Sequence, residues 1–400
     1  MIPQRLRRRE RCRHLLMNDQ NSFKDIVMTQ YKGLAPHRPL PDVESISSID
    51  ITGPRVATGA YSSSAPLYGE ALLVAAVDKV HLNIYDIPNP ALGVASNPPR
   101  LPLIHSISAA CVHRSVNFVS WYPVDVGMLF TSGPEGTIGV WDTHTASSAL
   151  VFDRLFERAA AIRMHAFSAA CEIHTLIAVA ARHPNIVLCD LRTGSKLLRL
   201  TGHQVGVRAV HWSPLTDYLL ASGGDDARVL LWDIRHTTAP LRELRSDSHR
   251  HRAGGVSIRF TDDGQGLFSV GDDRRVYLWD CISGSPAMVH FQRLADESSL
   301  AGEGRGISGG RVRREVAFTL FQDHILIPNK NTIGMFDMRN GEVQHMFHAH
   351  YGLVTGVASH PNRAELFSYG PDDGLLWWRR LRSSGEGQAR ELQEEDFWED

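Results

Sequence analysis

Short apolar segments recur along the whole chain, separated by polar turns rich in Gly, Asp, Ser and Pro. Residues 116–121 and 207–212 are two such segments, and each ends at a Trp that lies just before a Pro-containing turn. Gly-Asp-Asp turns occupy 224–226 and 271–273. Short apolar runs bounded by turn residues are typical of β-strands. The pattern therefore predicts an all-β protein built from many short strands.

The apolar runs belong to a repeat, which is marked by an aromatic or apolar residue followed by Asp. The anchors are Tyr85, Trp141, Cys189, Trp232, Trp279 and Phe336, each followed by Asp, and Trp378, followed by Arg. Successive anchors are 42 to 57 residues apart, and the shorter spacings match the WD repeat of about 40 to 45 residues. Four-stranded blades bury their faces by packing around a ring. The predicted fold class is all-β, a seven-bladed WD-repeat β-propeller with a short N-terminal helical segment.

Three residue types keep step with four of the anchors: a His 28 or 29 residues before, a hydroxyl residue 10 before and a carboxylate 6 before. The four sets are His113, Thr131, Glu135 and Trp141; His203, Ser222, Asp226 and Trp232; His251, Ser269, Asp273 and Trp279; and His350, Ser368, Asp372 and Trp378. Units one, three and six lack the full set, and we expect their blades to be the loosest.

These residue types also occur in hydrolase triads, so two interpretations compete. Catalysis needs one activated set in one cleft, whereas here the set recurs in phase with a structural Trp. Buried polar groups need partners. We therefore interpret the sets as hydrogen-bonded latches that hold the turns of single blades.

Composition narrows the class of function. The 42 basic and 44 acidic residues give a formal net charge of −2, so no overall field attracts nucleic acid. The five cysteines are scattered without a Cys-x-x-Cys pair, which predicts neither a disulfide framework nor a zinc site. The sequence has no Walker-type phosphate loop and no cluster of metal ligands. We expect a non-catalytic protein without a cofactor or metal.

The two ends differ in charge from the repeats. Residues 1–40 precede the first blade, residues 41–382 form the propeller, and residues 383–400 form an acidic tail. Arginines crowd residues 5–13, within a possible helix over residues 5–17 whose apolar side chains include Leu6, Leu15 and Leu16. The alternative is a basic tail or a nuclear-import signal. Neither a signal peptide nor a membrane-spanning run is present, so we expect the cytosol or the nucleus.

An Asp-x-Arg motif extends two anchors in neighbouring units. The motifs are Asp190 to Arg192 and Asp233 to Arg235, and a third, Asp337 to Arg339, follows later. Alternate residues of an extended strand lie on one side, so each guanidinium can brace on its own carboxylate and present its remaining donors. Two such motifs in consecutive blades resemble the signature of WD-repeat substrate receptors of cullin-4 RING ubiquitin ligases. The resemblance continues through residues 115–123, 127–128, 140–143, 188–191, 212–214 and 217–218.

This resemblance implies a nuclear, non-catalytic substrate receptor that acts in transcription-coupled nucleotide excision repair. It implies that the chain bridges the damaged-DNA-binding adaptor of the ligase to repair factors at stalled RNA polymerase II. The implied adaptor-binding residues are Asp190, Arg192, Asp233, Arg235, Leu6, Leu15 and Leu16. Substrates would take the opposite face, with no direct sequence-specific contact to nucleic acid and none to a membrane. The alternative is a WD-repeat scaffold of another nuclear assembly, in chromatin or ribosome biogenesis, in which the two arginines merely cap their blades.

Overall fold

The structure is a computed structural model, and it divides the chain into two units. One unit is Pro36–Trp378, and the other combines Met1–Ala35 with Arg379–Asp400. The helix expected over residues 5–17, with Leu6, Leu15 and Leu16, lies outside the described residues, as does the acidic tail. The described residues are 34–37, 46–51, 71–77, 79–88, 101–125, 127–157, 160–168, 175–246, 250–252, 254–287, 289, 291, 317–321, 323–348, 350–360, 363, 365–370 and 374–380.

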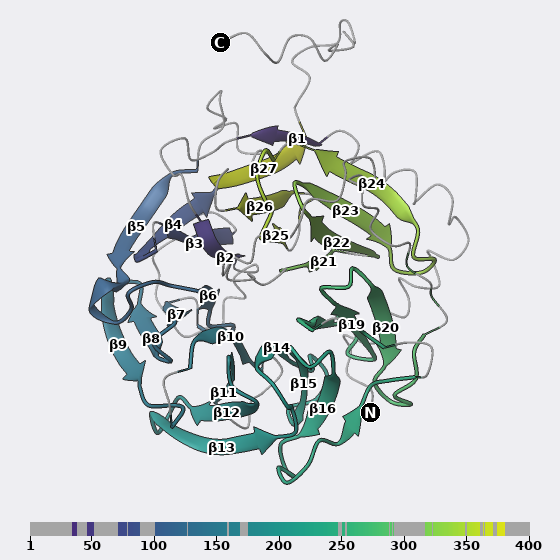
Figure 1. The fold of residues 1–400 in the computed structure, drawn as a ribbon. Helices are drawn as coiled ribbons and strands as arrows, with labels where there is room; N and C mark the ends of the chain where they lie inside the picture. The colour runs from purple at the N-terminus through teal and green to yellow at the C-terminus, as the bar shows by residue number, and fades with distance from the viewer. Residues whose placement is uncertain are drawn as a thin grey trace, which may run out of the picture. The chain divides into compact units, whose positions relative to one another are not determined.

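Seven antiparallel sheets surround a common centre (Figure 1). The first three blades are β2 (Ile46–Ile51), β3 (Ala71–Val77), β4 (His81–Ile87) and β5 (Leu103–Ser108); β6 (Phe118–Trp121), β7 (Met128–Ser132), β8 (Ile138–Asp142) and β9 (Ser147–Phe152); and β10 (Ile162–Phe167), β11 (Leu176–Ala181), β12 (Asn185–Asp190) and β13 (Ser195–Thr201). The short 3-10 helix η2 (Ala109–Cys111) follows β5.

The remaining blades complete the ring. They are β14 (Val207–Trp212), β15 (Leu219–Gly224), β16 (Val229–Asp233) and β17 (Arg242–Glu243); β18 (Ser257–Phe260), β19 (Gly266–Val270) and β20 (Val276–Asp280); β21 (Thr319–Phe321), β22 (His324–Asn329), β23 (Thr332–Asp337) and β24 (Val343–His348); and β25 (Gly356–Ser359), β26 (Leu366–Gly370) and β27 (Gly374–Arg380), with β1 (Leu34–His37). The seven-bladed β-propeller predicted from the repeat is confirmed.

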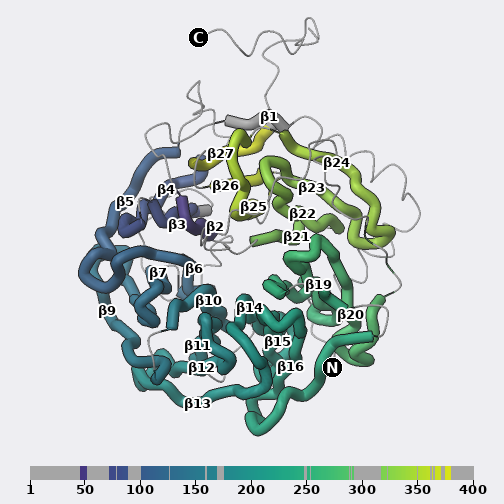
Figure 2. Tube along the Cα trace, in the orientation of Figure 1, coloured from purple at the N-terminus to yellow at the C-terminus, as the bar shows by residue number. Residues whose placement is uncertain are grey.

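Within each blade the strands lie side by side, in order from the centre of the ring to its rim (Figure 2). The second and third strands are almost continuously apolar; every residue of β11 is buried, and so is every residue of β16. Strands lose the alternation of polar and apolar residues when both faces of their sheet are covered. The cover comes from the neighbouring blades: Phe130 and Val140 of the second blade share one apolar cluster with Ile177 and Val187 of the third.

The seventh sheet is completed from the other end of the chain. Its strand order is β1-β27-β26-β25, so Leu34–His37 supplies the outer strand. These residues were expected in a segment that precedes the propeller, because a repeat marked by Trp-Asp anchors gives no signal for a lone outer strand. Within the described ranges, no helix has the length and apolar character that crossing a membrane needs.

Candidate functional site

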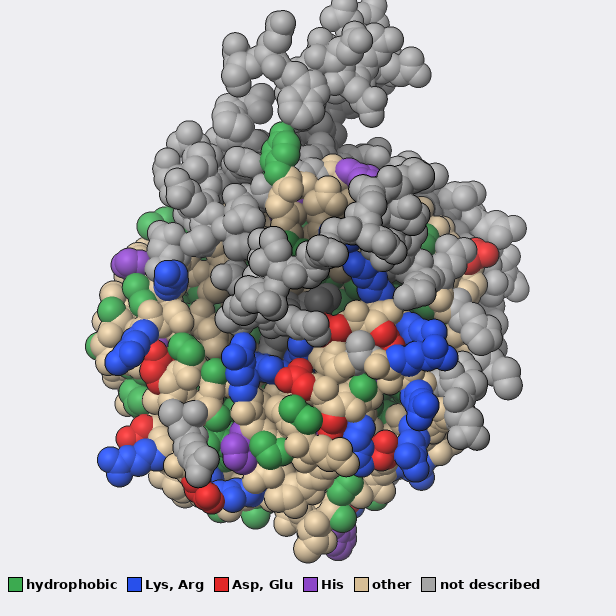
Figure 3. Space-filling view, viewed as in Figure 1, with side chains coloured by type: hydrophobic (Ala, Val, Ile, Leu, Met, Phe, Trp, Pro, Cys, Tyr) green, Lys and Arg blue, Asp and Glu red, His purple; other side chains and the backbone are tan. Residues whose placement is uncertain are grey.

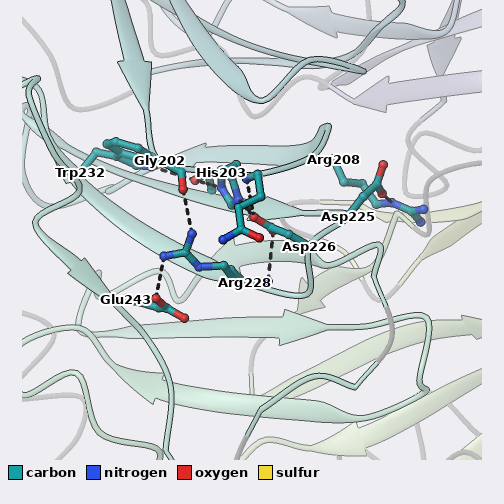
Figure 4. A network of polar contacts seen from close by, with 10 residues as sticks. Gly202, His203, Arg208, Asp225, Asp226, Arg228, Trp232 and Glu243 are labelled. Atoms are coloured by element: carbon teal, nitrogen blue, oxygen red, sulfur yellow. Dashed lines mark hydrogen bonds and ion pairs between the residues drawn. The ribbon is translucent and has the colours of Figure 1, made fainter.

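The phased residues of the fourth blade meet in one buried chain of hydrogen bonds, which we call the latch (Figure 4). The indole Nε1 of Trp232, on β16, donates to Ser222 Oγ on β15 over 2.7 Å. Ser222 Oγ lies 2.8 Å from Nε2 of His203, in the loop that enters the blade. His203 Nδ1 lies 3.0 Å from both carboxylate oxygens of Asp226. The latch therefore ties two strands, the entry loop and the β15–β16 turn together.

The carboxylate at one end of this latch, Asp226, is held in its ionised form. Burial alone would raise the pKa of Asp226, but hydrogen bonds from His203 and from backbone N–H groups outweigh burial and hold this pKa below its ordinary value. The ionised carboxylate accepts the Nδ1 proton of His203. Ser222 Oγ accepts from the Trp232 indole and lies within hydrogen-bond distance of His203 Nε2. Each group in the chain has its partner.

The fifth blade repeats this geometry. Ser269 Oγ accepts from Trp279 Nε1 over 2.8 Å and lies 2.8 Å from His251 Nε2. His251 Nδ1 lies 3.1 Å from Asp273 Oδ1, whose carboxylate also accepts the backbone N–H of Arg252 over 2.9 Å. The two blades thus carry the same latch, residue for residue.

The second blade departs from it at the carboxylate. Thr131 Oγ1 accepts from Trp141 over 2.8 Å and lies 2.9 Å from His113 Nε2. Glu135, however, stays 3.9 Å from His113 Nδ1, and the Thr137 hydroxyl takes its place at 3.1 Å. Glu135 still accepts a backbone N–H from the entry loop, at 3.0 Å. Glu135, with a longer side chain than Asp, thus keeps the hydrogen bond to the backbone of the entry loop but does not hydrogen-bond the ring of His113.

The seventh blade shows the same central contacts. Ser368 Oγ lies 2.6 Å from His350 Nε2 and accepts from Trp378 Nε1 over 2.8 Å. Asp372, the carboxylate expected at the end of this set, lies outside the described residues.

The latches do not offer a hydroxyl to a substrate. Ser222 is fully buried, His203 is 6% exposed, and the hydroxyl already bonds both Trp232 and His203 within the latch. A nucleophile of a hydrolase must reach its substrate from a cleft. The hydrogen bonds agree with the latches expected from the sequence, and we propose that these residues stabilise the blades.

A phased glycine makes room for the carboxylate in the second, fourth and fifth blades, a role that was not predicted. A Cβ at Gly224 would lie 2.3 Å from Asp226 Oδ1 and 2.6 Å from His203 Nδ1. A Cβ at Gly271 would lie 2.4 Å from His251 Nδ1. Gly stands two residues before the carboxylate in all four sets, and this recurrence is the signal that could have revealed it.

An ionic chain that was not predicted joins three blades. Arg163 of the third blade lies 2.7 Å from Asp225 in the β15–β16 turn of the fourth. The buried Arg208 of β14 lies 3.4 Å from Asp225 and 3.1 Å from Asp272 in the fifth blade. Arg163 and Arg208 are each the second residue of the first strand in their blade. That shared position was the available sequence signal.

The Asp-x-Arg motifs lie at the other end of the strands. Asp226 precedes β16, whereas Asp233 ends it, so each motif lies on the face opposite to the carboxylates of the latches. We call the end of the ring that carries Asp190 to Arg192 and Asp233 to Arg235 the Asp-x-Arg face. The end that carries the latch histidines and carboxylates is the latch face.

Arg235 is braced on this face by two contacts. Its Nη2 donates to Asp233 Oδ2 over 2.6 Å, and its Nε donates to Oδ1 over 2.9 Å. Its guanidinium carbon also lies 3.7 Å from the ring centroid of Tyr218. The Arg235 side chain remains 58% exposed. A cation held in one orientation at the surface loses little further entropy when a partner binds.

Arg192 is placed differently from the expectation. Asp190 accepts the Thr175 hydroxyl over 2.6 Å and the backbone N–H of Arg192 over 3.1 Å. Among the described residues, the exposed Arg192 guanidinium has no ion pair. The Asp190 carboxylate is already bonded to these neighbours, so the self-bracing inferred from the strand period occurs at Arg235 and not at Arg192. In the third motif, Arg339 pairs with Asp323 and not with Asp337.

Large apolar side chains stand in the turns of the Asp-x-Arg face. Leu215 is 60% exposed in the β14–β15 turn beside Tyr218, and Ile282, just after β20, is 77% exposed. Val124 in the β6–β7 turn is 69% exposed. Together with Arg235 and Tyr218 they give this face the mixture of Arg, aromatic and aliphatic groups that protein interfaces favour.

Comparison with known sequences adds to this geometry. The WD40 family model (WD domain, G-beta repeat) matches residues 194–233 and 241–280. The first match runs from β13, at the rim of one blade, through β16 of the next, and the second runs from β17 to β20. The chain is a WD40-repeat β-propeller. Such a repeat straddles two blades, which explains why the last sheet takes its outer strand from the start of the chain.

Several characterised proteins are similar to parts of this WD-repeat chain. WD repeat-containing protein ATCSA-1 from Arabidopsis thaliana is 23% identical over 342 residues, which cover 66% of this chain and 72% of that protein. A Ribosome biogenesis protein WDR12 homolog from Drosophila virilis is 30% identical over 143 residues, 33% of this chain and 30% of that protein. EARP and GARP complex-interacting protein 1 from Macaca fascicularis is 27% identical over 192 residues, 47% and 48%. The chain thus spans less than half of the last two.

The described part of the chain contains no group of three or more His, Cys, Asp or Glu residues arranged to hold a metal ion. WD-repeat propellers expose short, protected strand edges and turns around a rigid ring, and binding residues are often carried on such turns.

Proposed function

We propose that this chain is the substrate-recognition subunit of a cullin-4 RING ubiquitin ligase and docks on the damaged-DNA-binding adaptor through the Asp-x-Arg face. The observation that carries the proposal is the arrangement of Arg235 between Asp233 and Tyr218. It supports a docking role because a braced, exposed arginine beside exposed apolar turns has the composition of an interface hot spot.

Arg192 serves as the second contact in this proposal. It follows the same motif in the preceding blade and is exposed. Its guanidinium is not bound to Asp190, so it can adjust to a carboxylate of the adaptor. Leu6, Leu15 and Leu16 of the N-terminal segment are the third part, as an apolar helix face that would fill a groove on the adaptor.

Within this class, the motifs and the segments in blades two to four resemble the Cockayne syndrome A protein. We therefore assign the chain to transcription-coupled nucleotide excision repair in the nucleus, where it would bring repair factors at stalled RNA polymerase II to the ligase. Those factors would bind the latch face, because the adaptor takes the other one.

A second candidate is a scaffold of another nuclear assembly, in chromatin or ribosome biogenesis. The observation that favours it is the 30% identity to a Ribosome biogenesis protein WDR12 homolog over 143 residues. The latches themselves favour neither candidate, because they stabilise blades whatever those blades bind.

The experiment that separates the two is a pull-down of the tagged chain from nuclear extract, read by mass spectrometry. The wild type should recover the adaptor and cullin-4, and the Arg192→Glu, Arg235→Glu double variant should lose both. A chain lacking residues 1–20 should recover less of both. Proteins retained by the double variant are candidate substrates. Recovery of another assembly by the wild type, without adaptor or cullin, would favour the scaffold.

A further inference from the structure

A cavity of about 470 Å³ opens between the fourth and fifth blades. It lies on the latch face, because the β15–β16 turn and the loop that enters β18 both contribute to it. Its wall includes four arginines, Arg228, Arg245, Arg250 and Arg252, and two carboxylates, Asp226 and Glu243. We call it the blade four–five pocket.

Both carboxylates of the pocket are engaged within the protein. Asp226 binds His203 and accepts the backbone N–H of Gln204 over 3.0 Å. Glu243 accepts from Arg228 Nη2 over 2.7 Å, and Arg228 Nη1 donates to the Gly202 carbonyl over 2.7 Å (Figure 4). These bonds engage Arg228 and both acids. The side chains of the other three arginines have at most one long contact within the described residues, from Arg245 to Glu243.

Hydrogen bonds hold the backbone of Arg250 and Arg252 in place. The Arg252 backbone N–H donates to Asp273 over 2.9 Å, and the Arg250 carbonyl accepts from the Tyr277 hydroxyl over 3.3 Å. Both side chains are exposed, and within the described residues neither guanidinium has an ion pair. The Arg245 side chain is 72% exposed, and its ion pair with Glu243 is long, with 3.9 Å between Nη1 and Oε1. On the face drawn in Figure 3, Lys and Arg side chains are interspersed with Asp and Glu side chains on the side of the fourth and fifth blades.

Three buried apolar residues stand behind the charged lining of the pocket, and we call them its floor. Val229, Leu244 and Trp279 line it and are at most 3% exposed. A low-polarity floor weakens the screening of charges held above it, so a carboxylate in the pocket is attracted more strongly than on an open surface. Three arginines around such a floor match the side chains of an acidic peptide, to which guanidinium binds in bidentate fashion.

We propose that the blade four–five pocket binds an Asp- and Glu-rich segment of a partner protein. A nucleic acid fits less well, because Asp226 and Glu243 stand in the wall and would face a continuous phosphate backbone, and the whole chain has a net charge of −2. The site does not depend on the adaptor contact proposed above, and its test does not use the adaptor.

The test is an array of fluorescent peptides, each with an apolar residue at its centre and either Asp and Glu or Asn and Gln around it. Fluorescence anisotropy measures their affinity for the full chain. The acidic members should bind, and raising the salt from about 50 to 300 mM should weaken them, as expected for partly exposed charges. The Arg245→Glu, Arg250→Glu, Arg252→Glu variant should lose about tenfold or more in affinity.

Arg114 provides the matched control. It follows His113 in the second blade as Arg252 follows His251 in the fifth, is exposed, and likewise donates its backbone N–H to the blade's carboxylate. Arg114→Glu should leave peptide affinity unchanged, and all variants should keep the thermal midpoint of the wild type. The proposal is overturned if the wild type binds no acidic peptide, if Asn and Gln peptides bind equally, if Arg114→Glu costs as much as the pocket variant, or if single-stranded DNA binds more tightly than the peptides.

Discussion

The guanidinium of Arg235 lies over the ring of Tyr218, with its central carbon 3.7 Å from the ring centroid. The tyrosine comes from the β14–β15 turn and the arginine from the turn after β16, so the contact joins two loops of one blade. Cation–π contacts with guanidinium depend on the aromatic face and not on the hydroxyl. Tyr218 therefore positions Arg235 on the Asp-x-Arg face.

Removing that ring should weaken adaptor binding without unfolding the blade. We expect Tyr218→Ala to lower the affinity for the purified adaptor several-fold, and Tyr218→Phe to retain most of it, because Phe keeps the aromatic face. Biolayer interferometry gives both affinities. If the Ala variant bound as well as the wild type, Tyr218 would have no positioning role.

The latch should be measurable as stability. Ser222→Ala leaves the Trp232 indole N–H and the ring of His203 without their buried partner, and we expect a loss of about 1 to 3 kcal/mol in the free energy of unfolding. Urea denaturation followed by tryptophan fluorescence measures it. Ser195→Ala is the control, because Ser195 is exposed on the rim strand β13 and its hydroxyl bonds only to Thr193 within the described residues. Equal losses in the two variants would contradict the latch.

Gly224→Ala tests the space that the latch requires. The added methyl would lie 2.3 Å from Asp226 Oδ1, so the carboxylate has to move, and we expect a loss of about 1 to 3 kcal/mol. At Gly127 the nearest atom to an added Cβ is Asp125 Oδ1, at 3.1 Å, and that side chain is exposed and able to shift. Thermal denaturation of Gly224→Ala and Gly127→Ala should therefore differ. Similar midpoints would mean that the β15–β16 turn tolerates the methyl.

A buried histidine should make the fold sensitive to acid. Burial, with a smaller effect from His113, lowers the pKa of His165 to about 3, below the ordinary value of about 6.5. The unfolded chain therefore takes up this proton first as the pH falls. The contribution of His165 to stability is present above about pH 6.5 and is lost toward pH 3, by about 1.4 kcal/mol per pH unit. Burial likewise lowers the pKa of His211 and of His360 to about 4, so they add in the same direction.

The substitution His165→Gln removes the titrating group and leaves an amide that can bond Ser120 or Ser132, the present partners of His165 at 2.6 and 2.5 Å. Urea unfolding between about pH 7 and pH 5 should then lose stability less steeply than the wild type, by about one proton. An unchanged slope would show that His165 is already protonated in the folded chain.

The features that recur in several blades could be predicted from the sequence, whereas the features that occur at a single place could not. The ring of blades and the groups that meet in the latch could be predicted because the same residues recur at the same spacing in several units. The outer strand β1 belongs to a sheet whose other strands lie at the far end of the chain, and no local pattern marks it. The Arg163–Asp225–Arg208–Asp272 chain joins three blades. Asp225 and Asp272 each stand seven residues before a Trp anchor, but that spacing does not say which arginine of a neighbouring blade each one contacts.

The Asp-x-Arg motifs show a different limit. The strand period gives Arg192 and Arg235 the same relation to their aspartates, yet only Arg235 pairs with its own. The difference comes from Thr175, which occupies Asp190, and from Tyr218, which supports Arg235. Such neighbours come from another turn of the blade, and a motif read along one strand does not include them.

The most direct test of the proposed function is the dissociation constant between the purified chain and the purified damaged-DNA-binding adaptor. We predict that Arg192→Glu with Arg235→Glu raises it by a factor of about 100 or more, since charge reversal at an interface adds repulsion to the lost contact. Arg339→Glu, in the same motif of the sixth blade but paired with Asp323, should leave it nearly unchanged. Equal binding by the double variant and the wild type, at equal thermal midpoints, would contradict docking through the Asp-x-Arg face.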